Sequence, residues 1–345
     1  MNAVAGMQRR SLLAGILGAS AAAVLPFPER LLAAASKPAR RVIIDNDFGG
    51  DPDGLFMLAH FALCRSVAIP LVVGSHYRDF GAADRVPNKG QVSARKADEL
   101  LRLIPHGQRP TVLGGPDQPM AAGSGDGSAA SAAIIREAMR ADASTPLYYA
   151  AGGSLTAVAQ ALQAKPEIGK RLRLVWLGGA EHPDLADAPP GPAEPEYNFS
   201  LDPVAAQSVF NESDVEIWQI PRNAFRQMLF SVSELDELGR LNRLGRYLRH
   251  EVEAAHERLS AHLPPFIFSE GETIGLGDSS LVTTIALQSA FQPDSASSHY
   301  VTRPTPRLNS DGSYSAHPAG RPMRVYTRLD VDLTWRDMLA KFRAG

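Results

Sequence analysis

The sequence has little of what several common protein classes need. It contains a single cysteine, Cys64, so no disulfide can form within the chain. Its formal net charge is -2, which gives no indication of a nucleic-acid partner or an anionic membrane. It has neither a GxGxxG fingerprint nor a Walker loop, so a nucleotide-phosphate cofactor is not supported. The hydrophobic content of 44% and the charged content of 21% are ordinary for a globular protein of this length.

The first 37 residues have the pattern of an export signal. Arg9 and Arg10 precede an apolar stretch over residues 14–25, and Ala33-Ala34-Ala35 offers small residues for cleavage. A twin arginine ahead of a moderate apolar stretch is typical of bacterial Tat signals, and the stretch is short for a membrane span. We expect residues 1–37 to be a signal peptide, residues 38–345 to form the folded domain, and the protein to be periplasmic or secreted. An uncleaved amphipathic arm is the alternative.

An acidic loop, residues 45–53, is the most informative segment of the chain. It follows the apolar run Val42-Ile43-Ile44 and reads Asp45-Asn46-Asp47-Phe48-Gly49-Gly50-Asp51-Pro52-Asp53. Four like charges in so short a loop are unfavourable unless a positive charge lies among them. Ca²⁺ and Mg²⁺ prefer carboxylate oxygens, so the pattern predicts a hard divalent cation. A solvated turn with a helix cap is the alternative, but one cap needs one acid.

Apolar runs with strand character alternate with helical patterns along most of the chain. Predicted strands lie at residues 41–44, 69–73, 111–113, 147–150, 172–177 and 215–219, and predicted helices at 55–64, 93–103, 129–141, 156–163 and 203–211. This alternation predicts an α/β fold with a mostly parallel central sheet flanked by helices. Charged helices follow up to residue 259, then an apolar helix at 281–290, a strand at 324–327 and a last helix at 335–341. Residues 292–320 are expected to be a long surface connection.

Four blocks, in this order, make the chain resemble the inosine/uridine-preferring nucleoside hydrolase family over roughly residues 40–340. The first is the acidic loop. The second, Gly153-Ser154-Leu155-Thr156-Ala157, is similar to the family's Gly-Pro-Leu-Thr-Asn turn. The third, Glu196-Tyr197-Asn198, is like Glu-Phe-Asn, and the fourth, Gly277-Asp278-Ser279, stands where the family usually has His-Asp-Pro.

The resemblance implies a nucleoside hydrolase-like, Rossmann-like architecture that hydrolyses the N-glycosidic bond of a ribonucleoside or related riboside with a Ca²⁺-activated water. The implied ion ligands are Asp47, Asp53, the backbone carbonyl of Thr156, and Asp278. By the same resemblance Asp51 is the general base, and Asp45 orients its neighbours from behind. Glu196 and Asn198 are expected to hydrogen-bond the ribose hydroxyls. The expected partner is a small nucleoside or riboside, and a homo-oligomer is compatible with the family.

Two departures from the family pattern leave questions open. The family's loop commonly ends in two adjacent aspartates, whereas here Pro52 separates Asp51 from Asp53. We favour Asp51 as base and Asp53 as ligand, and the reverse assignment stays open. Gly277 stands where many members carry a histidine that protonates the leaving base. His76 and His182 follow predicted strands and are candidates for that role, with surface loop histidines as the alternative reading.

Two other functions compete with hydrolysis. A catalytically impaired periplasmic protein of the same fold could bind a nucleoside or sugar, and the separated aspartates and Gly277 motivate that reading. A phosphohydrolase of the haloacid dehalogenase type would explain Asp45-Asn46-Asp47 as an Asp-x-Asp motif. That family normally has Thr or Val two residues after the second aspartate, where Gly49 stands here.

Overall fold

The structure, a computed structural model, describes residues 38–79, 85–105, 107–121, 127–191, 194–260, 271–288 and 297–344. The chain divides into Met1–Lys37 and Pro38–Gly345, and the fold described below belongs to the second unit. The expected signal peptide lies outside the described residues. None of the described helices combines the length and the apolarity that a membrane span requires.

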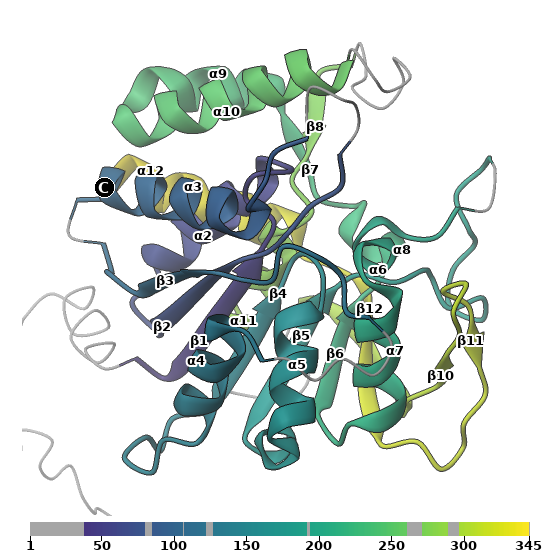
Figure 1. Ribbon diagram of the computed structural model, residues 1–345. Coiled ribbons are helices and arrows are strands. Elements are labelled where there is room, and N and C mark those ends of the chain that lie inside the picture. The colour runs from purple at the N-terminus through teal and green to yellow at the C-terminus, as the bar shows by residue number, and fades with distance from the viewer. Residues whose placement is uncertain are drawn as a thin grey trace, which may run out of the picture. The chain divides into compact units, whose positions relative to one another are not determined.

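A mostly parallel sheet runs through the centre of this unit (Figure 1). Among the described residues, eight strands form it in the order β3-β2-β1-β4-β5-β6-β12-β9. Their bounds are β1 (Arg40–Asn46), β2 (Val67–Gly74), β3 (Thr111–Gly114), β4 (Leu147–Ala151), β5 (Leu172–Leu177), β6 (Glu216–Ile220), β9 (His299–Pro304) and β12 (Pro322–Arg328). Neighbouring strands are parallel except for β9, which is antiparallel to β12. The predicted α/β class is confirmed.

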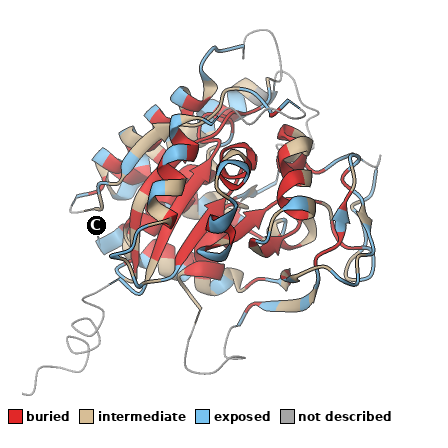
Figure 2. Ribbon diagram, turned by 60° about the horizontal axis from the view of Figure 1, so that its bottom comes forward, coloured by how far each residue is buried: buried red, intermediate tan, exposed pale blue. Residues whose placement is uncertain are grey.

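Helices cover both faces of the sheet because neighbouring residues of each strand point to opposite sides. Val42 and Ile44 of β1 join one core, with side chains from α2 (Asp53–Ala62), α3 (Lys89–Leu103), α11 (Ser279–Ile285) and α12 (Val331–Ala344). Ile43 joins the other core, with α4 (Ala129–Ala138), α5 (Thr156–Ala164) and α7 (Pro203–Glu212). Figure 2 shows the buried residues concentrated along the strands and the helix sides that face them.

Shorter elements connect and flank these layers. They are η2 (Pro166–Lys170), α6 (Tyr197–Leu201), α8 (Arg222–Phe225), β7 (Leu229–Ser231), α9 (Val232–Leu241), α10 (Arg243–Ser260), β8 (Thr273–Gly275), β10 (Arg307–Leu308) and β11 (Tyr314–Ser315). The helices α9 and α10 pack against each other beside the first core (Figure 1). The chain then returns through β8 to α11, which places the start of α11 at the sheet.

One expectation about the fold is wrong. Residues 292–320 were expected to be a long surface connection, but their described part contains β9, β10 and β11. The strand β9 lies at the edge of the sheet and buries none of its residues fully. An edge strand is held by main-chain hydrogen bonds to one neighbour, so its side chains need not be apolar. The polar composition of this segment therefore concealed a strand.

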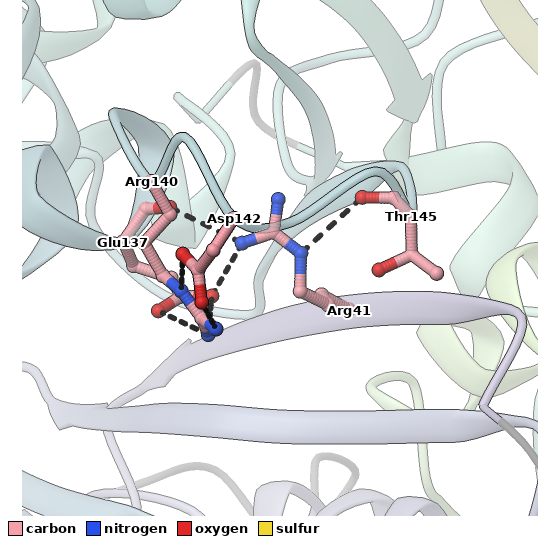
Figure 3. Close-up of polar contacts among 5 residues, drawn as sticks. All are labelled: Arg41, Glu137, Arg140, Asp142 and Thr145. Carbon is pink, nitrogen blue, oxygen red and sulfur yellow. Dashed lines mark hydrogen bonds and ion pairs between the residues drawn. The ribbon is translucent and has the colours of Figure 1, made fainter.

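An arginine cluster fixes the amino end of β1 (Figure 3). The Arg41 guanidinium donates to Thr145 O at 3.2 Å and to Glu137 O at 3.1 Å, and it forms an ion pair with the Glu137 carboxylate. Arg140 adds bonds to Asp142 at 2.8 Å and to Glu137 at 3.4 Å. The end of α4 and the loop into β4 are thereby tied to β1. This cluster supports the β1–β4 pairing, whose opposite end carries the acidic loop.

Candidate active site

The acidic loop lies against the turn that follows β4. Asp45 of β1 pairs with Ala151 of β4, and Gly152 N donates to Asp45 O at 3.0 Å. Because the carboxyl ends of parallel strands meet at one edge of a sheet, residues from both turns face the same space. The parallel pairing therefore brings the first and second sequence blocks together.

The fourth block joins this space from far along the chain. Asp278 immediately precedes α11, and its backbone N donates to Asp53 Oδ2 at 3.1 Å. The side-chain amide of Asn46 donates to Asp278 Oδ2 at 2.7 Å. Asp278 is buried and Asp53 is half-buried. The structure thus places two of the predicted ion ligands, Asp53 and Asp278, in direct contact.

Small residues leave room around the carboxylates of Asp47 and Asp278. A Cβ at Gly152 would lie 2.5 Å from Asp278 Oδ1, and a Cβ at Gly153 would lie 3.5 Å from Asp47 Oδ1. A Cβ at Gly50 would lie 3.2 Å from Asp47 Oδ2. Glycine is required where another group approaches the backbone this closely. The two glycine turns therefore permit the carboxylates to converge.

Electrostatics make the cluster of Asp47, Asp51, Asp53 and Asp278 unfavourable without a cation. Burial, followed by repulsion from Asp51 and Asp53, raises the pKa of Asp47 well above its usual range. Burial and repulsion from Asp53 do the same to the pKa of Asp278. Asp47 Oδ2 is buried and lacks a hydrogen-bond partner among the described residues. All four donors are hard carboxylates, so the cluster fits Ca²⁺ or Mg²⁺.

Asp51 and Asp53 differ in their surroundings. Asp51 is exposed as a residue, yet the protein atoms packed around its carboxyl group, together with repulsion from Asp53, raise its pKa. The nearby charge of Arg258 opposes that rise. Burial also raises the pKa of Asp53, and its hydrogen bonds with Asp278 oppose the rise. Asp53 is therefore joined to Asp278, whereas Asp51 lies at the rim of the cluster.

Asp45 is fully buried beside the cluster and accepts hydrogen bonds from the hydroxyls of Ser75 and Tyr149. Burial raises its pKa to about 6, even though both hydrogen bonds favour the charged form. Asp45 lies at the end of β1, two residues before Asp47, and its orienting role stays a prediction. The two hydroxyl partners lie on β4 and directly after β2, and no sequence pattern marked either of them as a partner of Asp45.

Thr156 begins α5 at the turn that follows β4. Its hydroxyl donates to Asp202 Oδ2 at 2.6 Å, and the same oxygen accepts from Met120 N at 2.8 Å. Asp202 Oδ1 accepts from Ala205 N at 2.9 Å and so caps α7. Asp202 therefore ties three segments together and fixes the start of α5, where the backbone carbonyl of Thr156 was predicted to be a ligand.

Glu196 and Asn198 are buried and bonded to the backbone. The Glu196 carboxylate accepts from Asn198 N at 3.0 Å and from Phe199 N at 3.0 Å, which caps α6, and from Gly179 N at 2.7 Å. The Asn198 amide donates to Leu177 O at 2.8 Å. These bonds hold the third block against the end of β5. Tyr197, between them, lies close enough to Asp47 for that charge to raise its pKa further after burial.

The two candidate histidines are buried, so the reading of them as surface loop residues is wrong. The ring nitrogens of His76 lie 3.2 Å from Pro116 O and 3.3 Å from Leu201 O. The His182 ring stacks on Tyr314 at 4.2 Å between centroids. Gly277 does face the cluster, because a Cβ there would lie 3.5 Å from Asp53 Oδ2. Residue 277 therefore lies beside the acidic cluster, but as a glycine it has no side chain that could donate a proton to a leaving group.

Two residues of this site were missed from the sequence. Asn46 orients Asp278, as described above. Arg258, on α10, donates to Gly49 O at 3.2 Å and to Gly50 O at 2.6 Å. A cavity of about 190 Å³ lies beside this contact and is lined by residues of the acidic loop and of α10. Asn46 stood inside a recognised motif, whereas Arg258 was one of many charges on an amphipathic helix and carried no distinguishing signal.

A second group of possible ligands lies between α2 and α12. Ligand atoms of His60, Cys64 and Asp337 lie within 4.8 Å of one another. The ammonium of Lys341 is already bonded to Asp337, and it donates to Cys64 Sγ at 3.2 Å. His60 Nε2 lies 2.6 Å from Asp337 Oδ2. A positive charge therefore already satisfies this carboxylate, and the group is accounted for as a contact between helices.

Comparison with known proteins places these residues in context. The sequence profile of the inosine-uridine preferring nucleoside hydrolases matches residues 42–270. That range includes the acidic loop, the turn after β4 and the Glu196–Asn198 segment, and it ends before Asp278. No curated protein sequence matches the chain.

Solved structures share the fold. The chain is similar to an inosine-uridine preferring nucleoside hydrolase from Bacillus anthracis, with a TM-score of 0.61, 16% identity, and coverage of 89% of this chain and 100% of that one. A purine-preferring ribonucleoside hydrolase from Gardnerella vaginalis gives a TM-score of 0.61, 17% identity, and coverage of 88% and 98%. A plant nucleoside hydrolase gives a TM-score of 0.56, 16% identity, and coverage of 89% and 100%.

Proposed function

The chain belongs to the inosine-uridine preferring nucleoside hydrolase family, and from this premise we propose that it hydrolyses the N-glycosidic bond of a ribonucleoside or related riboside with a water activated on Ca²⁺. The observation that carries the proposal is the contact between Asp53 and Asp278 beside the unpartnered oxygen of Asp47. Family membership leaves the phosphohydrolase reading of Asp45-Asn46-Asp47 without support.

We assign the ion to Asp47, Asp53 and Asp278, with the backbone carbonyl of Thr156 at the start of α5 as a further ligand. When bound, Ca²⁺ would lower the pKa of a coordinated water and so supply a hydroxide near neutral pH. Asp45 and Asn46 would hold Asp47 and Asp278 in place through the strand end and the 2.7 Å amide bond.

We assign the proton acceptor to Asp51. Asp53 is engaged by the backbone of Asp278, whereas Asp51 lies exposed at the rim, where an incoming water and a sugar could reach it. This difference supports Asp51 as base and Asp53 as ligand. The Glu196–Asn198 segment lies next to the loop through Tyr197, and we assign the ribose hydroxyls to Glu196 and Asn198. Buried polar groups that bind a hydroxyl discriminate strongly against a sugar that lacks it.

The residue that would protonate the leaving group is missing from its usual position in this site. Gly277 faces Asp53 and Phe225 and has no proton to donate. We therefore expect the enzyme to favour ribosides whose leaving group departs as a stable anion. A 4-nitrophenyl riboside, which needs no protonation, should be cleaved faster than inosine or uridine under the same conditions.

Base and ribose release from a panel of ribonucleosides and the chromogenic riboside, measured with added calcium, tests the proposal. Asp47→Ala should lose both calcium binding and turnover, whereas Asn198→Ala should weaken sugar binding and keep the ion. Saturable nucleoside binding without release of base or sugar from any substrate would instead favour a binding protein of the same fold. Full calcium affinity in Asp47→Ala would refute the ligand assignment.

We further propose that the protein is exported, on the strength of the twin arginine at positions 9 and 10. Replacing both arginines with lysine in the full chain should retain the protein in the cytoplasm of a bacterial host with a Tat pathway. Cell fractionation followed by immunoblotting measures this, and unchanged export of the lysine variant would refute it.

A further inference from the structure

A second cavity lies at the other end of α11 from Asp278. It measures about 210 Å³ and is lined by Arg40, Tyr148, Trp218, Thr284, Ile285, Gln288, Tyr300 and Arg324. The strand residues among them come from β1, β4, β6, β9 and β12. They share the sheet face that α11 covers, because Tyr148 and Trp218 belong to the same core as Val42 and Ile44. The cavity is therefore separate from the acidic cluster.

Arg324 is held in the wall of this cavity by aromatic rings. Its guanidinium carbon lies 4.0 Å from the centroid of the Trp218 ring and 4.5 Å from that of Tyr300. Contacts with two ring faces restrict a planar guanidinium, whose N–H groups all point outward in its plane. Arg324 is thus oriented before any ligand binds.

Two arginines of this cavity have no carboxylate partner in the part of the chain that the structure describes. Among the described residues, neither Arg40 nor Arg324 forms an ion pair with a carboxylate, and the cavity is lined by no acidic side chain. The neighbouring Arg173 differs, because it stacks over Trp218 at 4.9 Å and is also paired with Glu216 at 2.8 Å. Of these described arginines, Arg173 is therefore paired with a carboxylate, whereas Arg40 and Arg324 line the cavity without one.

We propose that this cavity binds a small oxyanion, a phosphate or carboxylate group, with Arg324 and Arg40 as the cationic residues of its wall. A guanidinium donates two parallel hydrogen bonds to either group, which a Lys ammonium cannot do. Gln288, three residues after the end of α11, adds a side-chain amide that can donate to a further oxygen. The volume suits a small ion or a single ring bearing one, since pockets for drug-sized ligands are larger, at about 300–1,000 Å³.

Packing alone is the competing explanation. Arginine stacked on aromatic rings stabilises many proteins without any ligand. It explains the position of Arg324 but gives no reason for Arg40 to face the same cavity without a carboxylate. The two explanations differ in what sulfate and benzoate should do, because only a binding site responds to the anion beyond its ionic strength.

Calorimetric titration of the full-length protein with sodium sulfate and with sodium benzoate tests the proposal, with sodium chloride at matched ionic strength as the blank. We expect saturable binding of at least one anion, and the tighter of the two identifies the group as phosphate-like or carboxylate-like. Arg324→Gln should weaken that binding about tenfold or more. Arg324→Lys should recover only part of it, since the charge remains and the fork is lost.

Arg328→Gln is the matched control, because Arg328 is exposed at the end of the same strand and the charge change is identical. It should bind the anion like the unchanged protein. Arg40→Gln provides the same test from β1 if Arg324→Gln fails to fold. Equal responses to the anions and chloride, or equal weakening by Arg328→Gln and Arg324→Gln, would overturn the proposal.

Discussion

The substitution Asp278→Asn separates the two roles of the acidic cluster, because it should stabilise the metal-free protein and weaken calcium binding. Asp278 is buried, and its pKa is raised by burial and then by repulsion from Asp53. Two unit charges about 5 Å apart repel by about 3 kcal/mol at an effective dielectric constant of about 20. Asparagine keeps the size of the side chain and an acceptor for the Asn46 amide, so packing changes little. We expect metal-free Asp278→Asn to be more stable by about 1–3 kcal/mol at pH 8.

The pH dependence of this gain in stability follows from the direction in which folding shifts the pKa of Asp278. The folded protein holds protons on Asp278 more tightly than the unfolded chain does, because its folded pKa is raised. Stability from this group is therefore fully present at acidic pH and falls as the pH rises through the unfolded value and toward the folded one. The difference between Asp278→Asn and the unchanged protein should accordingly shrink toward zero near pH 4.

Calcium should reverse the order of stability. At a concentration one hundred times its dissociation constant, a ligand stabilises the folded state by about 2.7 kcal/mol. The unchanged protein should gain this amount, and Asp278→Asn should gain much less, because one of its charged ligands is missing. Urea unfolding with calcium and with chelator, at pH 4 and pH 8, measures all of these differences.

Asp187→Asn, at an exposed acid distant in sequence from the cluster, controls for the lost charge. It should behave like the unchanged protein with and without calcium. The reasoning fails if Asp278→Asn is destabilised in chelator as well as in calcium, or if its calcium affinity by calorimetry equals that of the unchanged protein.

Three further predictions concern single residues. Because burial raises the pKa of Asp45 from 3.8 to about 6, this group should lower the metal-free free energy of unfolding by about 2 kcal/mol between pH 4 and pH 6.5, and Asp45→Asn should remove that part of the pH dependence in urea unfolding. Arg41→Ala should lower the free energy of unfolding by about 2–4 kcal/mol, since it removes two hydrogen bonds to the backbone and one of the two ion-pair partners of Glu137. Arg140→Ala, at a more exposed ion pair, should lower it by less than about 1 kcal/mol, and thermal unfolding measures both. Arg258→Ala should lower kcat/KM about tenfold by freeing the Gly49 and Gly50 carbonyls, and Arg258→Lys should restore part of it; equal activity of all three forms contradicts that role.

The sequence was sufficient for the parts of the fold and site that depend on local pattern. The segment from Val42 to Asp53 indicates both a strand and an ion site, because a short apolar run and crowded acids can be recognised without any partner. The edge strand β9 was missed because its main-chain bonds, and not its side chains, hold it in the sheet. Arg258 was missed for a related reason, since its contact with the loop depends on the docking of α10 and not on the residues around it.

The contribution of Asp278 shows where local reading ends. The turn before α11 carries one acid among serines and glycines, and nothing nearby marks that acid as more than a helix-start residue. Only the resemblance to a family indicated a role for Asp278. In the structure, the side-chain amide of Asn46, 232 residues earlier, holds the Asp278 carboxylate at the acidic cluster. A long-range contact of this kind is invisible to periodicity and composition, because neither residue departs from what its own element would accept.

The two ends of β1 have opposite effects on stability, and this opposition explains the construction of the site. At the amino end, Arg41 bonds two backbone carbonyls and the Glu137 carboxylate, and so joins α4 and the loop before β4 to the strand. At the carboxyl end, Asp47 and Asp278 repel their neighbours and have raised pKa values. A strand that carries an unfavourable cluster must be fixed by contacts elsewhere, or the repulsion would relax by moving the backbone. Because the amino end of β1 is anchored, the strain stays in the carboxylates, where binding a cation relieves it.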